Sequence, residues 1–340
     1  MHLPPSLRDL PICVDGCSLE PHAFTTPHFE RLTTVVALRG DGFVGRGEDV
    51  AYEAETQLEH RAFAPFALTG TATLGEWSTR LDDLELFSAE PATHASRDYR
   101  RWAYESALLD LGLRQAGTTL GALLDREPAP VGFCVSSGLG PTAWLAVDPA
   151  LEFKLDVGED WTAERIAELA ALDRVRVVDL KAHYGESFGL DTATAHRQLE
   201  LLIAGLPADV VIEDPPVDDH ALALLAGRLG RVAFDAPVHS VADMLRLPET
   251  GWMNIKPSRF GTVARLLEAI THCEHHGIRL YGGGQFELST GRRQIQELAA
   301  LFYPTGPNDV APSAYNAPAV ETGLPRSPLS GLGRAPGFGA

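Results

Sequence analysis

The stretch "DVVIEDPPVDD", residues 209–219, ends an apolar run on two acidic residues. Three β-branched residues lead up to Glu213, and the two prolines that follow Asp214 cannot continue a central strand. A carboxylate at the tip of a buried strand costs free energy unless it is solvated, paired or bound to a metal. A recurrence of such tips along the chain would therefore indicate a site.

Charged residues do recur at the ends of successive apolar runs. "VRVVD" ends at Asp179, "VVIE" at Glu213 and "VAFD" at Asp235, and the next run, "MNIK", ends at Lys256. The spacings of 34, 22 and 21 residues each correspond to about one β/α unit. The C-terminal ends of barrel strands meet at one mouth, so these side chains are expected to converge there. Three carboxylates are the hard oxygen ligands that suit Mg²⁺, and Lys256 would face the metal from one side.

Strand-like and helix-like segments alternate from about residue 130 onward, and this alternation predicts the fold class. Seven short apolar runs lie between residues 130 and 284, and helix-like segments such as "WTAERIAELAAL" separate most of them. The pattern predicts a parallel sheet, and the number of strands favours a (β/α) barrel of the TIM type. An open doubly wound sheet is the alternative, although no Gly-x-Gly-x-x-Gly follows the first strand.

The first third of the chain has a different pattern, which predicts an α+β unit. "RLTTVVALRG" and "GFVGRGEDV" flank Asp41-Gly42, a dipeptide that favours a tight hairpin turn. Residues 97–124 have the periodicity of a long helix followed by a shorter one. We expect an α+β domain over residues 1–125, the barrel over 126–310, and an irregular tail rich in Gly and Pro over 311–340 that packs back on the first domain.

Composition excludes several classes of partner. The net charge of -18 argues against nucleic-acid and anionic-membrane binding. No apolar run reaches the roughly 18 residues of a transmembrane helix, and the N-terminus lacks the basic and apolar regions of a signal peptide. The four cysteines are dispersed and predict reduced thiols. We therefore expect a cytoplasmic protein without nucleic-acid or membrane partners.

Several segments together resemble one known family. "GFVGRGEDV" is similar to its cap hairpin, "AYESALLDLGLRQAGTTLGALL" to the helix before its barrel, and "VRVVD", "IEDPP" and "AFDAP" to its three metal-ligand strands. "NIKPSRFG" is similar to its lysine strand, and "GGGQFELSTGRRQ" to its Gly-Gly-Met-x-Glu segment, with Gln285 in place of Met. In order and spacing the chain resembles the enolase superfamily, in the muconate-lactonizing and o-succinylbenzoate-synthase-like branch (the mandelate racemase/muconate lactonizing enzyme family).

The resemblance implies a modified TIM-type barrel with an α+β N-terminal capping domain, and one Mg²⁺ bound by Asp179, Glu213 and Asp235. It also implies that a lysine base removes the proton α to the carboxylate of a small-molecule substrate, and Lys256 is the candidate. Homo-oligomers are common in the family, so we expect one here. In the cap, residues 21–31 stand where the family has a loop that closes over the substrate. Phe24 and His28 in this loop, and Gln285 and Glu287 near the seventh strand, are candidate substrate-binding residues.

One departure from the family pattern bears on catalysis. "FKLDVG" stands where the family has Lys-x-Lys-x-Gly, so that Lys154 is present and Asp156 replaces the second lysine. Lys181, two residues after Asp179, is expected to point into the barrel mouth. It would be either an ion-pair partner of Asp156 or a second acid–base group, and His183 is expected in the loop beyond it.

The expected reaction is a Mg²⁺-dependent β-elimination (dehydration) of the o-succinylbenzoate-synthase type, since elimination on one face needs only one lysine. A cycloisomerase or epimerase of the same branch is the alternative. Two further hypotheses lie outside this class. One is a metal-independent lyase or aldolase that forms a Schiff base on Lys256 or Lys181. The other, suggested by Asp156, is a family member that has lost catalysis and only binds a ligand.

Overall fold

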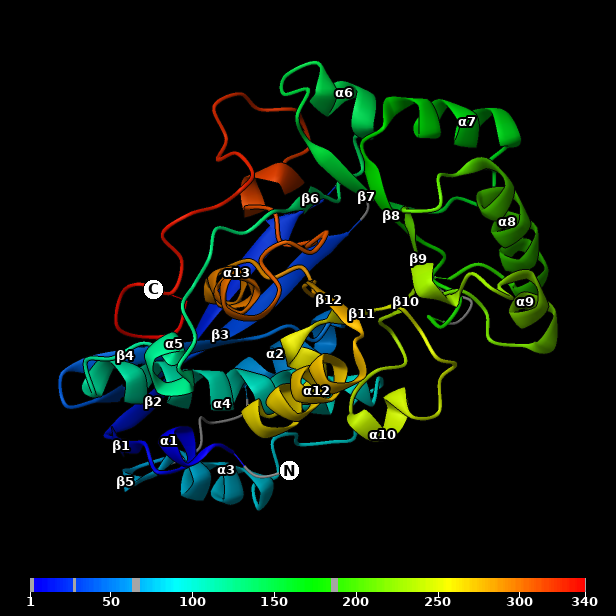
Figure 1. The fold of residues 1–340 in the computed structure, drawn as a ribbon. Helices are drawn as coiled ribbons and strands as arrows, with labels where there is room; N and C mark the ends of the chain where they lie inside the picture. Colours follow the sequence, from blue (N-terminus) through cyan, green and yellow to red (C-terminus); the bar gives the residue numbers. More distant parts are fainter. Residues whose placement is uncertain (1–2, 27–28, 63–67, 185–188, 340) are drawn as a thin grey trace.

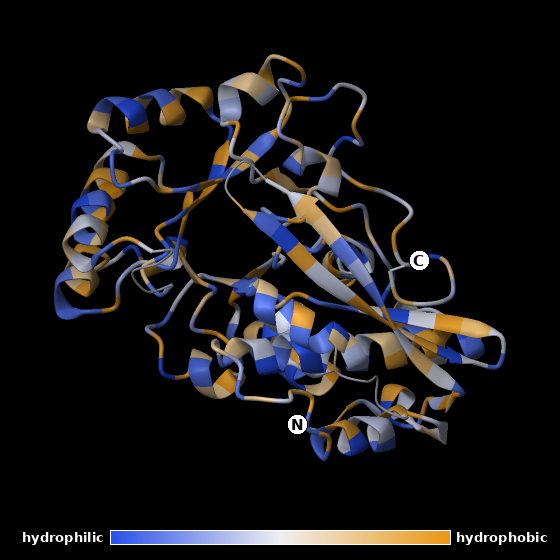
Figure 2. Cartoon of the chain, turned by 180° about the vertical axis from the view of Figure 1, so that it is seen from behind, coloured by the Kyte–Doolittle hydropathy of each residue, from blue (hydrophilic) through white to orange (hydrophobic). Residues whose placement is uncertain are grey.

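The computed structural model describes residues 3–26, 29–62, 68–184 and 189–339. It contains a three-stranded antiparallel sheet, a two-stranded sheet and a seven-stranded parallel sheet (Figure 1). Apolar residues from all of these parts belong to one continuous hydrophobic core, which includes Leu38, Leu108 and Ile212. Bands of hydrophobic and hydrophilic residues alternate along the outer helices (Figure 2), as expected for helices that bury one face.

The N-terminal part is built on the antiparallel sheet, with the strand order β2 (Gly16–Thr25), β3 (Glu30–Gly40) and β4 (Phe43–Asp49). Asp41 and Gly42 join β3 to β4 with φ angles of 51° and 80°, so both occupy the left-handed region that a two-residue hairpin turn requires. The predicted hairpin is therefore confirmed. β1 (Pro11–Val14) pairs with β5 (Gly70–Thr73). The helices of this part are α1 (Pro5–Arg8), α2 (Ala54–Ala62), α3 (Leu74–Asp82), α4 (Ala95–Gln115) and α5 (Leu120–Leu124).

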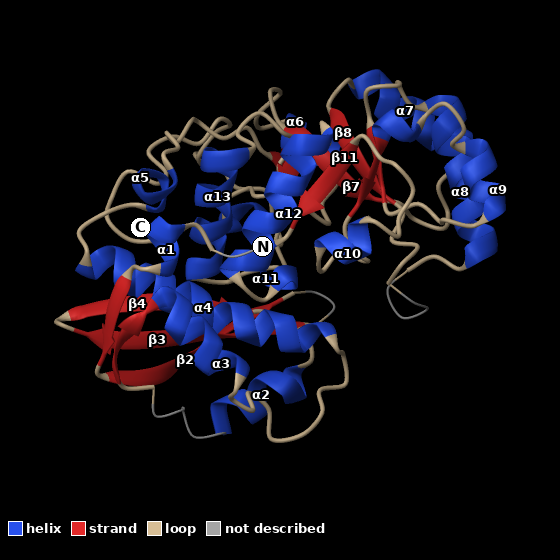
Figure 3. Cartoon of the chain, turned by 60° about the horizontal axis from the view of Figure 1, so that its bottom comes forward, coloured by secondary structure: helices blue, strands red, loops and turns tan. Residues whose placement is uncertain are grey.

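Helix α4 connects the antiparallel sheet to the rest of the molecule (Figure 3), because it packs against β4 on one side and α11 (Pro257–Phe260) on the other. Two glycines of β4 permit the backbones of β4 and α4 to approach each other closely. A Cβ on Gly45 would lie 2.3 Å from the carbonyl oxygen of Ala107, and one on Gly47 would lie 2.1 Å from that of Ala103. The Gly-x-Gly of the hairpin is thus a packing requirement.

The parallel sheet has the strand order β12-β11-β10-β9-β8-β7-β6, so that each strand lies beside its neighbour in the sequence. The strands are β6 (Cys134–Val135), β7 (Glu152–Asp156), β8 (Val175–Asp179), β9 (Val211–Glu213), β10 (Val232–Phe234), β11 (Trp252–Ile255) and β12 (Arg279–Gly282). A doubly wound sheet reverses its strand order at a switch point, and this sheet does not. The predicted barrel-type fold with an α+β domain is confirmed, and the doubly wound alternative is wrong.

A short segment links the two edge strands of this sheet. The backbone N–H of Cys134 in β6 donates to the carbonyl oxygen of Asn308 at 2.7 Å, and the N–H of Asp309 donates to that of Gly282 in β12 at 2.8 Å. The Asn308 side chain also accepts from the Gly282 N–H at 2.7 Å. Residues 308–309 therefore take the place of an eighth strand between β12 and β6.

Helices follow the parallel strands in turn. They are α6 (Pro141–Leu145), α7 (Ala163–Leu172), α8 (Thr192–Gly205), α9 (Asp219–Leu224), α10 (Val241–Met244), α11, α12 (Val263–His276) and α13 (Thr290–Phe302), with 3₁₀ turns at Leu229–Arg231 and Ser313–Asn316. None of the helices in the described ranges is long and apolar enough to cross a membrane.

The C-terminal segment returns across both parts of the molecule. The Leu329 N–H donates to the carbonyl oxygen of Val131 at 2.8 Å. Further along, Phe338 is fully buried beside Trp102 of α4, and its N–H donates to Asp110 at 2.8 Å. The N–H of Gly339 donates to Glu297 of α13 at 2.6 Å. The end of the chain is thus held between α4 and α13.

Candidate active site

The residues predicted from the strand tips lie together at one edge of the parallel sheet. Asp179 and Glu213 are the last residues of β8 and β9 and pair directly in register. Asp235 and Lys256 come directly after β10 and β11. All four side chains are buried. The carboxyl ends of parallel strands share an edge, and this brings charges distant in sequence into one mouth.

Glu213 lies at the centre of this group. Its Oε1 accepts hydrogen bonds from Lys154 Nζ at 2.6 Å and from Asn254 Nδ2 at 3.2 Å, and its Oε2 accepts from the Tyr281 hydroxyl. Lys154 Nζ also lies 3.6 Å from Asp179 and 3.7 Å from Asp309. The sequence analysis missed Asn254 and Tyr281. The parity of Asn254 with Lys256 in the same strand is the signal that could have identified the former.

Asp235 is held by cations and a hydroxyl. Lys256 Nζ lies 2.6 Å from its Oδ2, Arg259 Nε lies 3.2 Å from its Oδ1, and the Tyr184 hydroxyl donates to Oδ2 at 2.7 Å. Burial opposes ionisation, but the charges of Arg259 and Lys256 outweigh it and hold the pKa of Asp235 well below its usual range. This carboxylate is therefore ionised and strongly oriented.

Lys181 points into the same mouth, but not because β8 continues to it. The strand ends at Asp179, and Lys181 has a φ of 51°, in the left-handed region. Its N–H donates to Asp179 Oδ1 at 3.0 Å, while its Nζ lies 3.1 Å from Asp156 Oδ1 and 3.3 Å from Asp179 Oδ2. The predicted Lys181–Asp156 pair is present, with buried Asp179 as a second partner. His183, in the following loop, hydrogen-bonds the carbonyl oxygen of Pro215 at 2.9 Å.

Among the described residues, one buried carboxylate cluster at this edge has the spacing of a metal site. It comprises Asp179, Glu213 and Asp214, each of which offers an oxygen within 4.8 Å of the others. Oxygen donors of this kind suit Mg²⁺, so the residues fit that ion. Asp214 is a further candidate that was not predicted from the sequence, and the roles of Asp179, Glu213 and Asp235 as metal ligands stay predictions.

Asp214 was missed because neighbouring strand residues normally point to opposite faces. Its φ of 48° breaks that alternation and turns the side chain toward the end of β10. There its two carboxylate oxygens accept from the N–H groups of Asp235 at 2.8 Å and Ala236 at 2.9 Å. Asp214 therefore also fixes the backbone next to Asp235.

The buried acids differ in their electrostatics. Burial raises the pKa of Glu213 to about 7, against the attraction of Lys154. For Asp179 the effect of burial is smaller than the combined attraction of Lys154 and Lys181, so its pKa is lowered. Against the opposing effect of burial, Glu213 and Asp179 raise the pKa of Lys154, and Asp179 and Asp156 raise the pKa of Lys181. Lysine charges thus neutralise the acidic groups in this structure.

A cavity of about 760 Å³ opens above these groups. The chain contains only three lysines, Lys154, Lys181 and Lys256, and all three line it, together with Asp156 and Asp179. The other 25 basic residues are arginines. The pKa of a lysine shifts readily with its surroundings whereas arginine keeps its charge, so these three lysines are the candidates for proton transfer in this cavity.

The four residues predicted to bind substrate lie in different surroundings. Phe24 packs edge-on against Phe286, which lines the cavity, with ring centroids 5.9 Å apart. Gln285 is buried and bonds Tyr99 at 3.0 Å, and Glu287 is buried 3.3 Å from Arg292. His28 lies outside the described residues. None of the other three is part of the cavity lining, and their roles remain predictions.

Comparison with known families covers most of the chain. Residues 127–317 match the C-terminal domain of the family described as "Domain of unknown function (DUF8230)", and residues 5–123 match its N-terminal domain. The chain belongs to the DUF8230 family. The two matches meet between residues 123 and 127, close to the change of pattern seen in the sequence.

Individual relatives agree with the resemblance found in the motifs. The o-succinylbenzoate synthase of Bacillus subtilis (strain 168) is 25% identical over 229 residues, which span 62% of this chain and 58% of that protein. An N-succinylamino acid racemase of an Amycolatopsis species is 29% identical over 261 residues, or 69% of this chain and 68% of that protein. The match to the synthase thus covers less than two thirds of its length.

A solved structure shares the fold. The "Mandelate racemase/muconate lactonizing enzyme" from a Roseiflexus species covers 90% of this chain and 91% of its own, with a TM-score of 0.67 and 23% identity. Together these findings confirm the resemblance to the muconate-lactonizing and o-succinylbenzoate-synthase-like branch of the enolase superfamily.

Proposed function

We propose that this member of the DUF8230 family is a Mg²⁺-dependent enzyme that removes the proton α to the carboxylate of a small substrate, in a β-elimination like that of an o-succinylbenzoate synthase. The observation that carries the proposal is the convergence of all three lysines of the chain on the cavity above the buried carboxylates. The names of the related synthase and racemase support it.

Asp179, Glu213 and Asp214, with Asp235 beside them, would hold the ion. Bound there, Mg²⁺ supplies electrophilic stabilisation of the negative charge that develops on the substrate carboxylate. The residues of the chain supply the proton transfer. Lys256 Nζ, oriented by Asp235 at 2.6 Å, is the base in this proposal.

Lys181 and Lys256 reach the carboxylates from the ends of different strands, since they follow β8 and β11. β8 and β11 flank β9 and β10 in the sheet, so the two amines approach the acidic groups from two sides. Lys181 could therefore return a proton or assist a leaving group. The same arrangement keeps an isomerase as the second candidate, since racemisation needs acid–base groups on both faces and one relative is named a racemase.

Loss of the α-proton signal of the substrate in D₂O tests the proposal whatever product is formed, because elimination and exchange with the solvent both remove that proton. Wild-type protein with Mg²⁺ should exchange the α-proton of a suitable N-succinylamino acid or succinylated cyclic acid, as followed by proton NMR. Lys256→Ala should lower the exchange rate by about 10²–10⁴-fold. Arg246→Ala is the control, because Arg246 is a surface residue paired with Asp243.

The outcome also separates the alternatives. Exchange with formation of an unsaturated product indicates elimination, whereas exchange with loss of optical activity indicates an isomerase. Full exchange by Lys256→Ala would contradict the assignment of the base. Borohydride trapping of a carbonyl substrate on a lysine would favour the Schiff-base mechanism. Saturable binding of these acids with full retention of the α-proton signal would favour the ligand-binding alternative that Asp156 suggests.

A further inference from the structure

Residues 283–291, which we call the β12–α13 segment, form part of the wall of the cavity above the buried carboxylates. Gly284 and Phe286 of this segment line that cavity. Phe286 has a φ of 56°, in the left-handed region. A bulky residue rarely adopts this conformation, and it persists only where the surrounding contacts outweigh the strain. The contacts that hold the β12–α13 segment therefore decide the shape of the cavity wall.

The first of these contacts comes from Arg31 in β3. Its side chain is buried, and it donates from Nη2 to the carbonyl oxygen of Gln285 at 2.8 Å and from Nε to that of Phe286 at 3.3 Å. The same guanidinium group donates to the carbonyl oxygens of Val50 and Ala51, just after β4, at 2.7 and 2.8 Å. One buried side chain thus ties the residues after β4 to the β12–α13 segment.

Both of the tied segments place aromatic rings on the cavity. The guanidinium carbon of Arg31 lies over the ring of Tyr52, 4.2 Å from its centroid. Tyr52 and Phe286 both line the cavity, and Phe29, which also lines it, packs edge-on against Phe286 with ring centroids 6.4 Å apart. A planar guanidinium group stacks on a ring and donates to several carbonyl groups at once, which an ammonium group does not. The positions of these rings therefore depend on Arg31.

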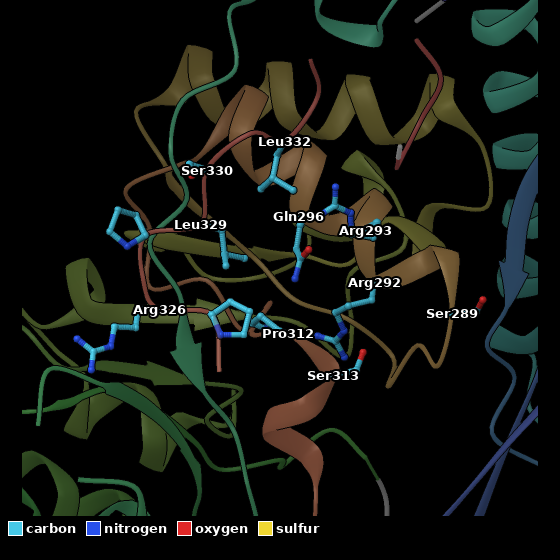
Figure 4. Close-up of a pocket in the computed structure, with 12 residues that line it drawn as sticks. Ser289, Arg292, Arg293, Gln296, Pro312, Ser313, Arg326, Leu329, Ser330 and Leu332 are labelled. Carbon is cyan, nitrogen blue, oxygen red and sulfur yellow. The ribbon is translucent and has the colours of Figure 1, made fainter. Parts of the chain in front are cut away.

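The second contact comes from Glu48 in β4, the last residue of the Gly-x-Gly-Glu motif. Its buried carboxylate accepts from the N–H groups of Leu288 at 2.7 Å, Ser289 at 3.0 Å and Gly291 at 2.9 Å. Ser289 precedes α13 but does not cap it with its own side chain, so Glu48 satisfies the first N–H groups of this helix. In the close-up of the cavity beside α13, Ser289 lies next to the blue strands of the N-terminal part (Figure 4).

We propose that Arg31 and Glu48 are positioning residues, which impose the conformation of the β12–α13 segment from the N-terminal part and so present the Phe286 ring to the substrate. This inference rests on the proposed function of the cavity. The ring of Phe286 has no polar group and suits an apolar side chain of the substrate, while the charged residues serve the reacting end. Neither Arg31 nor Glu48 lines the cavity, so their loss should weaken substrate binding more than proton transfer.

Hydrogen exchange followed by mass spectrometry tests these contacts without any substrate. Arg31→Lys keeps the charge but loses the planar group, and Glu48→Gln keeps the size but turns N–H groups toward backbone donors. Each variant should speed amide exchange within residues 283–291 by about tenfold or more. Arg100→Lys is the matched control, because Arg100 is also buried and lies 3.7 Å from the centroid of the Phe87 ring. Its hydrogen bonds in the described part of the chain stay within residues 49–86.

Loss of the α-proton of N-succinylphenylalanine in D₂O gives the functional readout. Arg31→Lys and Glu48→Gln should each raise KM by about tenfold or more and change kcat by less than about threefold, whereas Arg100→Lys should keep the wild-type KM. Phe286→Gly should raise KM as well, because it removes the ring. Glycine adopts the left-handed conformation without strain, so Arg31→Lys should have no further effect on KM in the Phe286→Gly background.

Unchanged exchange within residues 283–291 in both variants would overturn the proposal, and so would faster exchange with an unchanged KM. Independent effects of Arg31→Lys and Phe286→Gly on KM would also overturn it, since Arg31 would then act by another route. Glu48→Gln with Phe286→Gly provides the same comparison if Arg31→Lys does not fold.

Failure of the proposed function gives a different result. If the wild type binds the acid in calorimetry but leaves its α-proton in place, the proposed function is wrong, and the dissociation constants of the same variants decide the inference in place of KM. Absence of any binding of this acid by the wild type would overturn the role of Phe286 in contacting an apolar side chain.

Discussion

Replacing Lys181 by Met tests which of its two carboxylate partners matters. Asp156 is 58% exposed and its pair with Lys181 is 3.1 Å long, so this contact should contribute about 0.5 kcal/mol, as exposed ion pairs do. Asp179 is only 1% exposed, and Lys181 Nζ lies 3.3 Å from it. Loss of one partner of a buried pair costs about 3–5 kcal/mol. Since Lys181 is itself 29% exposed and Lys154 remains 3.6 Å from Asp179, we expect a loss no greater than the lower end of that range.

A double-mutant cycle measured by chemical denaturation, without divalent cations, resolves the two contributions. Lys181→Met should lower the free energy of unfolding by about 3 kcal/mol, and Asp156→Ala by less than about 1 kcal/mol. The double mutant should be nearly as unstable as Lys181→Met alone. Arg176→Met with Glu152→Ala is the matched control, because this pair also joins β7 to β8, at 2.7 Å with similar exposure.

Restoration by Asp156→Ala of the stability lost in Lys181→Met would contradict this prediction, because Lys181 would then serve only Asp156. Turnover gives an independent readout. If Lys181 has only a structural role, folded Lys181→Met should show a modest change in kcat. If Lys181 is a second acid–base group, kcat of the fully folded variant should fall by about 10²–10⁴-fold.

Three other predictions follow from single contacts. Glu213→Gln should weaken Mg²⁺ binding by at least about tenfold in calorimetry, and equal affinity of both proteins would remove Glu213 from the metal site. Phe338→Ala should lower the free energy of unfolding by about 3–5 kcal/mol, because this fully buried ring packs beside Trp102; a change below about 1 kcal/mol would show that the tail is not anchored there. Burial raises the pKa of Glu297 from 4.5 to about 7. Between these two pH values the carboxyl is protonated in the folded state but ionised in the unfolded state. The free energy of unfolding should therefore fall by up to about 3 kcal/mol as the pH rises from 4.5 to about 7. Glu297→Gln should flatten this slope in unfolding curves, and an unchanged slope would contradict it.

Much of the architecture was readable from local patterns. The alternation of apolar runs and helical segments predicted the parallel barrel-type sheet, because strand and helix periodicities are properties of short stretches. The Asp41-Gly42 turn was predictable because its two residues tolerate positive φ. The acidic strand tips at Asp179 and Glu213 were found because parallel strands in a barrel end at one edge.

Other features depended on tertiary structure. Asp214 points into the site through a left-handed backbone conformation that ordinary strand alternation does not foresee. Lys181 was expected in the mouth, but it reaches the mouth through a left-handed residue after β8 has ended. Residues 308–309 close the sheet without a strand-like sequence, because the hydrogen-bonding groups of Cys134 and Gly282 on its two edges need partners. The sequence by itself therefore determined which residues carry the charges and in what order along the strands. Only the folded chain decided which charges meet, because contacts between distant segments follow from packing and backbone turns that no local pattern encodes.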